Sequence, residues 1–341
     1  MSPITLSRET IAMPAQPIKF DPHGDVKLQV GRLEDSGQIL FTACSRTLAR
    51  VSPVFERMLF GNFAESKSNT TSGKKEWIVK LPADKAVPLA VFMYISHGHL
   101  HRVPKTLPID ELYDLTTLTN YYDSTRILGP WIHSWMESVE EDVRDSRTSL
   151  SKALWISWEL GHSDLFERIA HKMLMEADGP YGADDPTFQD LSMPPEIIER
   201  IDAIRLDTIQ AILDIFQDMV EHLVVVDEKP RWCHHAEWMG HHRCESMILG
   251  SMTLCLVRAG LWPLPHPEDI EISIIALYRK TTSLIIHDIG KVGEKPLIDH
   301  RKCNPGPFIL SQVSKIINEM ESPVTDIHQK LMEEQIQRLH Q

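Results

Sequence analysis

The sequence has no long hydrophobic run. Its longest apolar patches, such as Leu223 to Val226 and Leu284 to Ile286, are only a few residues long, whereas a helix that crosses a bilayer needs about 20 consecutive apolar residues. The first residues, Met1 to Gln16, also lack the basic stretch and apolar core of a signal peptide. We therefore expect a nuclear or cytoplasmic protein with no membrane contact.

Cysteine is scarce, with five residues in 341. So few in a long chain do not make a disulfide framework, and in a reducing compartment they are expected to be thiols or metal ligands. The sequence also lacks a glycine-rich phosphate loop, a G-x-S-x-G elbow and a dinucleotide fingerprint. The sequence therefore offers none of these three enzyme signatures.

Positive charge is in deficit. The formal net charge is −13. The negative charge comes from residues 138–341, which have 20 basic and 34 acidic side chains, whereas residues 18–137 have 14 basic and 13 acidic side chains. Nucleic-acid binding draws much of its affinity from Lys and Arg beside phosphates. Direct binding of DNA or RNA is therefore not expected.

The hydrophobic pattern predicts strands and helices, an α+β arrangement, from Asp25 to Val139, preceded by a flexible N-terminus at 1–17. Alternating residues predict strands at 26–30, 39–42 and 77–81, with a turn at 31–37 between the first two. Ser52 followed by Pro53 predicts a capped helix start. Helices are expected around Leu48 and at 53–60, 88–97, 110–122 (capped by Asp110) and 127–139.

Residues 138–341 show helical periodicity and no convincing strand pair. A charged linker is expected at 138–149, then a helical region at 150–229 and a second at 230–341 that contains a Cys/His cluster. A Gly/Pro/Asp-rich loop is expected at 178–186. Within the two regions, helices are predicted at 165–174, 197–223, 246–259, 269–287, 308–320 and 325–340.

The segment from Phe41 to Phe55, FTACSRTLARVSPVF, resembles the core signature of the BTB/POZ domain. That signature reads Phe-x-x-His-Lys-x-x-Leu and then Ser-Pro-x-Phe. Here Phe41, Leu48, Ser52 and Phe55 stand at the matching positions, and the later Phe63-Ala64-Glu65-Ser66 matches a Phe-x-Glu-Ser segment. The resemblance covers residues 18–137, about a third of the chain. Val103-Pro104 and Gly260-Leu261-Trp262-Pro263 look like a fungal group of BTB proteins of largely unknown function.

The resemblance implies a small sheet with surrounding helices that binds other protein chains. The chain is then expected to be an adaptor or scaffold rather than an enzyme, and a substrate adaptor of a cullin-type ubiquitin ligase is one form that this role can take. The alternative is a homodimeric regulatory or architectural protein without a ligase role. One departure bears on the homodimer. The family's His-Lys pair is replaced by Cys44-Ser45, near the place where family members form their dimer interface.

Cysteine and histidine gather in two segments of the second helical region. Cys233-His234-His235 and His241-His242-Arg243-Cys244 form the first, and His300-Arg301-Lys302-Cys303 the second. Zinc takes four Cys or His donors, often as two pairs, so Cys233, Cys244, His300 and Cys303 are the candidate ligands of a structural zinc ion. The alternative is a set of buried thiols and solvated histidines. Cys255, among Leu254, Leu256 and Val257, is expected in the core.

A second metal hypothesis concerns His287-Asp288. The run Leu284 to Lys291 resembles the metal-binding core of HD-type phosphohydrolases, in which adjacent His and Asp hold metals that activate water. The alternative is an ordinary helix end, with Gly290 in the left-handed conformation. This enzyme is the remote alternative to an interaction protein.

Overall fold

A computed structural model describes residues 17–31, 38–66, 76–145, 149–182, 191–224, 232–233, 235, 241–293 and 297–339. The chain divides into two compact units. Unit 1 comprises residues 1–169, 190–194 and 325–341, and unit 2 comprises residues 170–189 and 195–324. No described helix is both long and apolar enough to span a membrane.

Unit 1 contains a four-stranded sheet in the order β1-β3-β2-β4. The strands are β1 (Ile18–Lys19), β2 (Val26–Val30), β3 (Ile39–Ala43) and β4 (Ile78–Leu81). β2 and β3 pair antiparallel, while β4 joins β2 in parallel and β1 joins β3 in parallel. Every second residue of β2 is buried, which confirms the alternation seen in the sequence. The turn predicted between β2 and β3 lies almost entirely outside the described residues.

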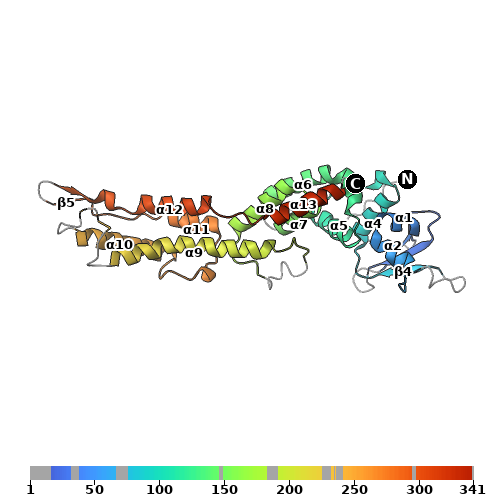
Figure 1. Ribbon diagram of the computed structural model, residues 1–341, viewed down its shortest axis with the longest axis horizontal. Coiled ribbons are helices and arrows are strands. Elements are labelled where there is room, and N and C mark those ends of the chain that lie inside the picture. Colours follow the sequence, from blue (N-terminus) through green and yellow to red (C-terminus); the bar gives the residue numbers. More distant parts are fainter. Residues whose placement is uncertain are drawn as a thin grey trace. The chain divides into compact units, whose positions relative to one another are not determined.

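Unit 1 also contains helices, of which α1 and α2 lie between β3 and β4 in the sequence and the others come after β4 (Figure 1). They are α1 (Ser45–Val51), α2 (Pro53–Phe60), α4 (Ala86–Ser96), the 3-10 helices η1 (Leu100–Arg102) and η2 (Thr125–Trp131), α5 (Ile109–Tyr121), α6 (Ile132–Asp145), α7 (Leu150–Glu159), α8 (Ser163–Glu176, whose last turns belong to unit 2) and α13 (Asp326–Leu339). Eight consecutive residues of α4, from Pro88 to Ile95, are buried. A helix that is apolar on all sides belongs inside a core.

Local signals place α2 against the core. The Ser52 hydroxyl accepts a hydrogen bond from the Phe55 amide at 3.0 Å and donates to the Tyr122 carbonyl at 2.6 Å. The Phe55 ring is fully buried and stacks on Tyr122, with centroids 4.3 Å apart. The predicted cap is confirmed, and it also ties α2 to the end of α5.

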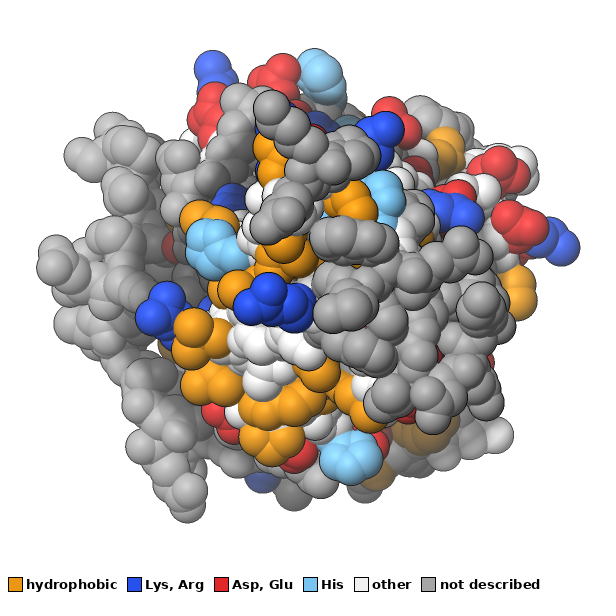
Figure 2. Space-filling model, turned by 90° about the vertical axis from the view of Figure 1, so that its left-hand side faces the viewer, with side chains coloured by type: hydrophobic (Ala, Val, Ile, Leu, Met, Phe, Trp, Pro, Cys, Tyr) orange, Lys and Arg blue, Asp and Glu red, His pale blue; other side chains and the backbone are white. Residues whose placement is uncertain are grey.

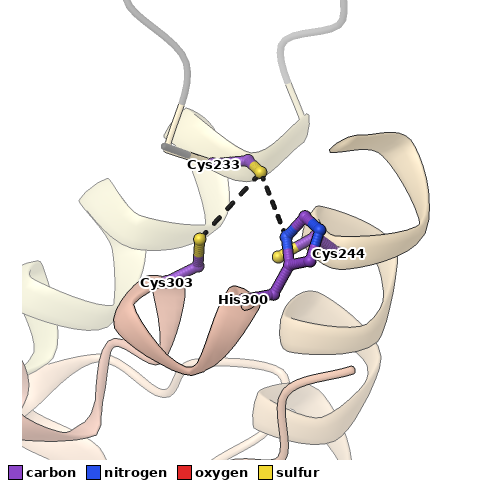
Figure 3. A group of neighbouring side chains, drawn as sticks. All are labelled: Cys233, Cys244, His300 and Cys303. Atoms are coloured by element: carbon purple, nitrogen blue, oxygen red, sulfur yellow. Dashed lines mark hydrogen bonds between the residues drawn. The ribbon is translucent and has the colours of Figure 1, made fainter. Parts of the chain in front are cut away.

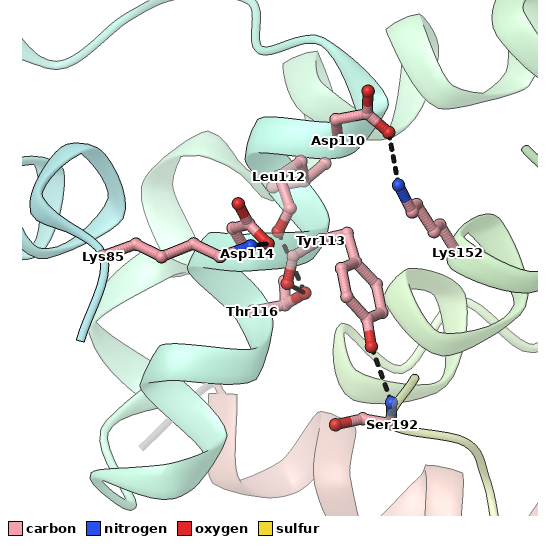
Figure 4. A network of polar contacts seen from close by, with 8 residues as sticks. All are labelled: Lys85, Asp110, Leu112, Tyr113, Asp114, Thr116, Lys152 and Ser192. Carbon is pink, nitrogen blue, oxygen red and sulfur yellow. Dashed lines mark hydrogen bonds and ion pairs between the residues drawn. The ribbon is translucent and has the colours of Figure 1, made fainter. Parts of the chain in front are cut away.

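Polar contacts attach neighbouring segments to α5 (Figure 4). Lys85 and Lys152 pair with Asp114 and Asp110, both at 2.7 Å. The Tyr113 hydroxyl accepts a hydrogen bond from the amide of Ser192 at 2.6 Å. α5 itself begins at Ile109 after Pro108, so Asp110 lies in the first turn and is not the predicted cap.

Unit 2 is built on α9 (Ile197–Val224), the longest helix. The other elements are α10 (His241–Ala259), η3 (Pro267–Asp269), α11 (Ile274–Thr282), β5 (Lys291–Val292), β6 (Ile298–Asp299), η4 (His300–Cys303) and α12 (Gly306–Asn318). α9 packs against α10, α11 and α12, and its core face includes Ile212, Phe216 and Met219. On the end of the unit that carries β5, hydrophobic and basic side chains lie exposed beside one another (Figure 2).

Three predictions about the secondary structure of residues 138–341 are wrong. α6 continues to Asp145, so most of the charged linker 138–149 is helix, because its charges fall on the exposed face of an amphipathic helix. The helix predicted at 269–287 is α11 alone, which ends at Thr282. A two-stranded antiparallel ribbon, β5 with β6, is present where no strand was expected.

The compact units also depart from the predicted domains. Unit 1 continues past residue 137 to 169, and it includes α13 from the C-terminus. Docking of α13 depends on Gly161, which has φ +70° and lies so close to Ile336 that an added Cβ would be 2.6 Å from its Cγ1. Residues 1–16 of the expected flexible N-terminus lie outside the described residues.

Candidate metal centre

Four side chains from three separate segments of unit 2 converge on one buried point (Figure 3). Cys233 lies in the short described segment after α9, Cys244 in the first turn of α10, and His300 and Cys303 at the two ends of η4. One donor atom from each lies within 4.8 Å of all the others, and all four residues are buried. The structure thus brings together the four residues singled out in the sequence, in a cluster that can bind a metal ion.

The distances suit a tetrahedral ion. The Sγ atoms of Cys233 and Cys303 are 3.9 Å apart, and the Cys233 Sγ lies 3.5 Å from Nδ1 of His300. Tetrahedral bonds of about 2.3 Å to sulfur and about 2.0 Å to nitrogen give sulfur–sulfur separations of about 3.8 Å and sulfur–nitrogen separations of about 3.5 Å. Both distances match, and three thiols with one imidazole is a common donor set of structural zinc sites.

Short-range contacts fix η4, which supplies two of the four donors. Asp299 caps it by accepting a hydrogen bond from the Arg301 amide at 3.1 Å, and it also pairs with the Arg301 guanidinium at 2.6 Å. The amide of His300 donates to the carbonyl of Gly290 at 2.8 Å. Gly290 has φ +65°, a left-handed conformation that glycine adopts without strain. The β5–β6 ribbon therefore holds His300 in place.

A second layer of groups surrounds the sulfur atoms. The amide of His235 donates to the Cys233 Sγ at 3.4 Å, and the amide of Cys233 donates to the buried Glu245 carboxylate at 3.2 Å. The indole of Trp232 donates to the Cys303 carbonyl at 2.7 Å. Such outer contacts orient metal ligands. Sequence reasoning missed all of them, although Trp232 and Glu245 each stand next to a predicted ligand.

Burial sets the protonation of the cluster. Loss of water contact raises the pKa of the Cys233 thiol and that of the Cys244 thiol, and the neighbouring thiols raise the latter further. Burial also lowers the pKa of His300. Its Nε2 is buried without a hydrogen-bond partner among the described residues. Burial therefore favours the neutral forms of Cys233, Cys244 and His300, and a bound cation would reverse the penalty on thiolates.

The remaining cysteine and histidine residues considered in the sequence are not among the four converging donors, or their side chains are not described by the structure. Cys255 is half-exposed and donates to the Ile285 carbonyl at 3.2 Å, so the prediction of a core position is wrong. The His235 ring lies 5.2 Å from that of His300. His234 and the side chains of His241 and His242 are outside the described residues.

The segment that resembles a phosphohydrolase core is not helical. His287 and Asp288 lie between α11 and β5 in an irregular stretch, because the helix ends at Thr282. The Asp288 carboxylate accepts hydrogen bonds from the Gly290 amide at 2.8 Å and from Asn304 at 3.2 Å. Asp288 thus has a structural part in the loop that supports His300.

No protein-family model matches this chain, and no curated protein matches it.

Proposed function

We propose that the chain is a protein-interaction adaptor. Its partner binds unit 1, and one structural zinc ion holds the loops of unit 2. A groove in unit 1 supports the first part most directly. The groove has a volume of about 530 Å³ and lies between α2, the β4–α4 turn and α5. Its lining is mainly apolar and includes Met58, Pro88, Leu118 and Tyr121, and the Tyr121 side chain is 70% exposed.

Two polar groups in the groove could orient a bound partner. The Thr117 hydroxyl lines it and is buried without a hydrogen-bond partner among the described residues. The Asp84 carboxylate accepts a hydrogen bond from Tyr122 at 2.6 Å, and burial raises its pKa. Apolar walls with a few fixed polar groups are typical of sites that bind another molecule. A buried unpaired hydroxyl gains a hydrogen bond if a partner's polar group fills the groove.

The sequence resemblance to BTB domains supports a cullin-type scaffold as the partner. A hairpin of β2 and β3, the α1–α2 pair and a following strand suit that resemblance. Phe60 and Phe63, which follow the signature, are 45% and 55% exposed. Exposed large hydrophobic side chains that cluster on one domain often mark a protein interface. The helical unit 2 would then present a second protein to the ligase.

Binding of the purified full-length chain to the N-terminal domain of a BTB-binding cullin tests this proposal. We expect Tyr121→Asp to weaken the complex at least tenfold, because it places a charge in an apolar contact. Leu100→Asp is the matched control, since Leu100 is 56% exposed on η1 and does not line the groove, and it should bind like the wild type. Absence of cullin binding together with a dimer in sedimentation would favour the homodimeric regulator.

The zinc proposal rests on the 3.9 Å and 3.5 Å separations of the donor atoms. When bound, zinc would supply a positive charge that stabilises the thiolates and links the segment after α9 to α10 and η4. Metal analysis of the purified protein should give close to one zinc per chain. Cys303→Ser should lose the metal and lower the melting temperature of unit 2, whereas Cys255→Ser, outside the cluster, should retain both. Equal zinc content in the two variants would contradict the site.

A further inference from the structure

The helix α10 has one exposed face that is apolar in the middle and basic at both ends. We call it the α10 seam, and it consists of Arg243, Met247, Gly250, Leu254, Val257 and Arg258. At 100° per residue these six positions lie within an arc of about 100°. All six are exposed, and Met247, Leu254 and Val257 are 45%, 50% and 51% exposed.

The opposite face of α10 packs into the core of unit 2. Ile248, Met252 and Leu256 are fully buried and belong to the core of unit 2. The helix therefore does not need the apolar residues of the seam for its own packing. A heptad-like spacing of exposed apolar residues is the pattern by which one helix packs along another.

Gly250 lies at the centre of the seam. Glycine is a poor helix former, and a Cβ added at Gly250 would meet no atom within 4 Å. Among the described residues, the packing therefore gives no reason for a glycine in the middle of the helix. The missing side chain leaves room for a second backbone to approach α10 closely.

The apolar surface extends sideways from the seam. The segment after α11 runs along α10, because Cys255 donates to the Ile285 carbonyl at 3.2 Å and Ser251 accepts from the His287 amide at 2.8 Å. Ile285 is 71% exposed. Together with Leu254 and Val257, it widens the apolar surface available to a partner.

The charges at the ends of the seam identify the occupant. Neither guanidinium, of Arg243 or of Arg258, has a hydrogen-bond or ion-pair partner among the described residues. In an antiparallel pair of seams, Arg243 of one chain would lie near Arg258 of the other. In a parallel pair, each of these arginines would lie near the same residue of the other chain. Both arrangements place like charges side by side, which is unfavourable.

We propose that the α10 seam binds an amphipathic helix of a partner protein, with apolar residues spaced three and four apart and acidic side chains at both ends. The distance from Arg243 to Arg258 corresponds to about four helical turns, or about 22 Å. Such a helix would pack its apolar stripe on Met247, Leu254 and Val257. This surface belongs to unit 2 and is distinct from the groove of unit 1, so each proposal can fail without the other.

Fluorescence anisotropy with the full-length protein and three synthetic 21-residue peptides tests the proposal. The first has a leucine stripe with glutamates at both ends, the second has the same stripe with lysines, and the third has the glutamates and a shuffled stripe. We expect the first to bind at least tenfold more tightly than either of the others. Added salt should weaken its binding, because the ion pairs are exposed.

Variants connect the binding to the seam. Leu254→Asp should weaken it at least tenfold, and Arg258→Glu should shift the preference toward the lysine peptide. Gly250→Met should weaken binding while the melting temperature stays equal or rises, since its Cβ would meet no atom of the described residues within 4 Å. Leu310→Asp is the matched control, on the 46% exposed Leu310 of α12, and should bind like the wild type. Equal binding of the glutamate and lysine peptides would overturn the proposal, as would a dimer that Leu254→Asp dissociates.

Discussion

At the scale of single residues, buried titratable groups control how the two units respond to pH. Glu159 is 3% exposed in unit 1. Its carboxylate accepts hydrogen bonds from Thr125 and from Asn120, the latter at 2.9 Å. Burial nevertheless dominates and raises the pKa of Glu159 to about 7. Near neutral pH this carboxyl therefore changes charge inside the fold.

The raised pKa of Glu159 makes the stability of unit 1 depend on pH. Between the ordinary pKa of 4.5 and about 7, the folded chain holds a proton that the unfolded chain has lost. Unit 1 therefore gains stability as pH falls and loses it as pH rises through 7, by up to about 3 kcal/mol. We expect Glu159→Gln to remove this dependence. Glu167→Gln, on the exposed side of α8, should keep it.

Hydrogen exchange of the α7 amides between pH 5 and 8 measures this effect in unit 1 alone. Measuring only α7 separates the effect of Glu159 on unit 1 from the effect of the zinc cluster on unit 2. Thiolate ligands must lose protons, so a bound zinc ion makes unit 2 less stable as pH falls, the opposite direction. Exchange from α7 that slows as pH rises, after correction for the intrinsic rate, would contradict the assignment to Glu159.

At the scale of elements, one arginine joins α9 to two loops of unit 2. Arg205 is 1% exposed. Its guanidinium donates to the carbonyls of Ile270 at 2.7 Å and Ile272 at 3.1 Å, and to those of Ala177 and Asp178 at 3.4 Å. Because these carbonyls belong to segments outside regular helices, the arginine satisfies acceptors that the backbone leaves unpaired.

Loss of this arginine should destabilise unit 2 strongly. We expect Arg205→Met to lower the free energy of unfolding by about 3 kcal/mol, because several buried carbonyls lose their donor. Urea unfolding followed by tryptophan fluorescence measures the change. Arg279→Met, on the last turn of α11, is the control and should change stability little. A wild-type midpoint for Arg205→Met would mean that water reaches these carbonyls.

At the scale of the whole molecule, the chain leaves unit 1 and returns to it. α13 belongs to unit 1, although most of unit 2 lies between α13 and the rest of unit 1 in the sequence. Gln335 of α13 donates to the Glu159 carbonyl at 3.0 Å, and the buried His328 ring contacts Trp158 and Phe166. The last helix therefore completes the core of the first unit.

Removal of α13 should affect the two units differently. A chain that ends after Val324 should show a lower melting temperature for unit 1, because Trp158, Phe166 and Gly161 lose the helix that covers them. Unit 2 should keep its stability and its zinc content. Calorimetry together with metal analysis distinguishes the two responses. A uniform loss of both would show that the units do not fold independently.

The sequence by itself determined the features that depend on neighbouring residues. Alternation in Val26–Val30 gave a strand with one buried face, and the Ser52-Pro53 pair gave the start of α2. These signals are local, since a cap or an alternating face is defined within a few residues. The composition of the Cys/His cluster could also be predicted, because three of the five cysteines lie beside histidines in the two short segments 233–244 and 300–303.

Only the tertiary structure decided what depends on residues far apart in the sequence. Convergence of Cys233 with His300 requires the β5–β6 ribbon and the capped η4, neither of which the periodicity indicated. The end of α11 at Thr282 and the return of α13 to unit 1 follow from packing, since the local pattern also suits a longer helix and a separate C-terminal region. Both features depend on burial against segments that are distant in the sequence. A local pattern does not indicate against which segment a helix face will pack.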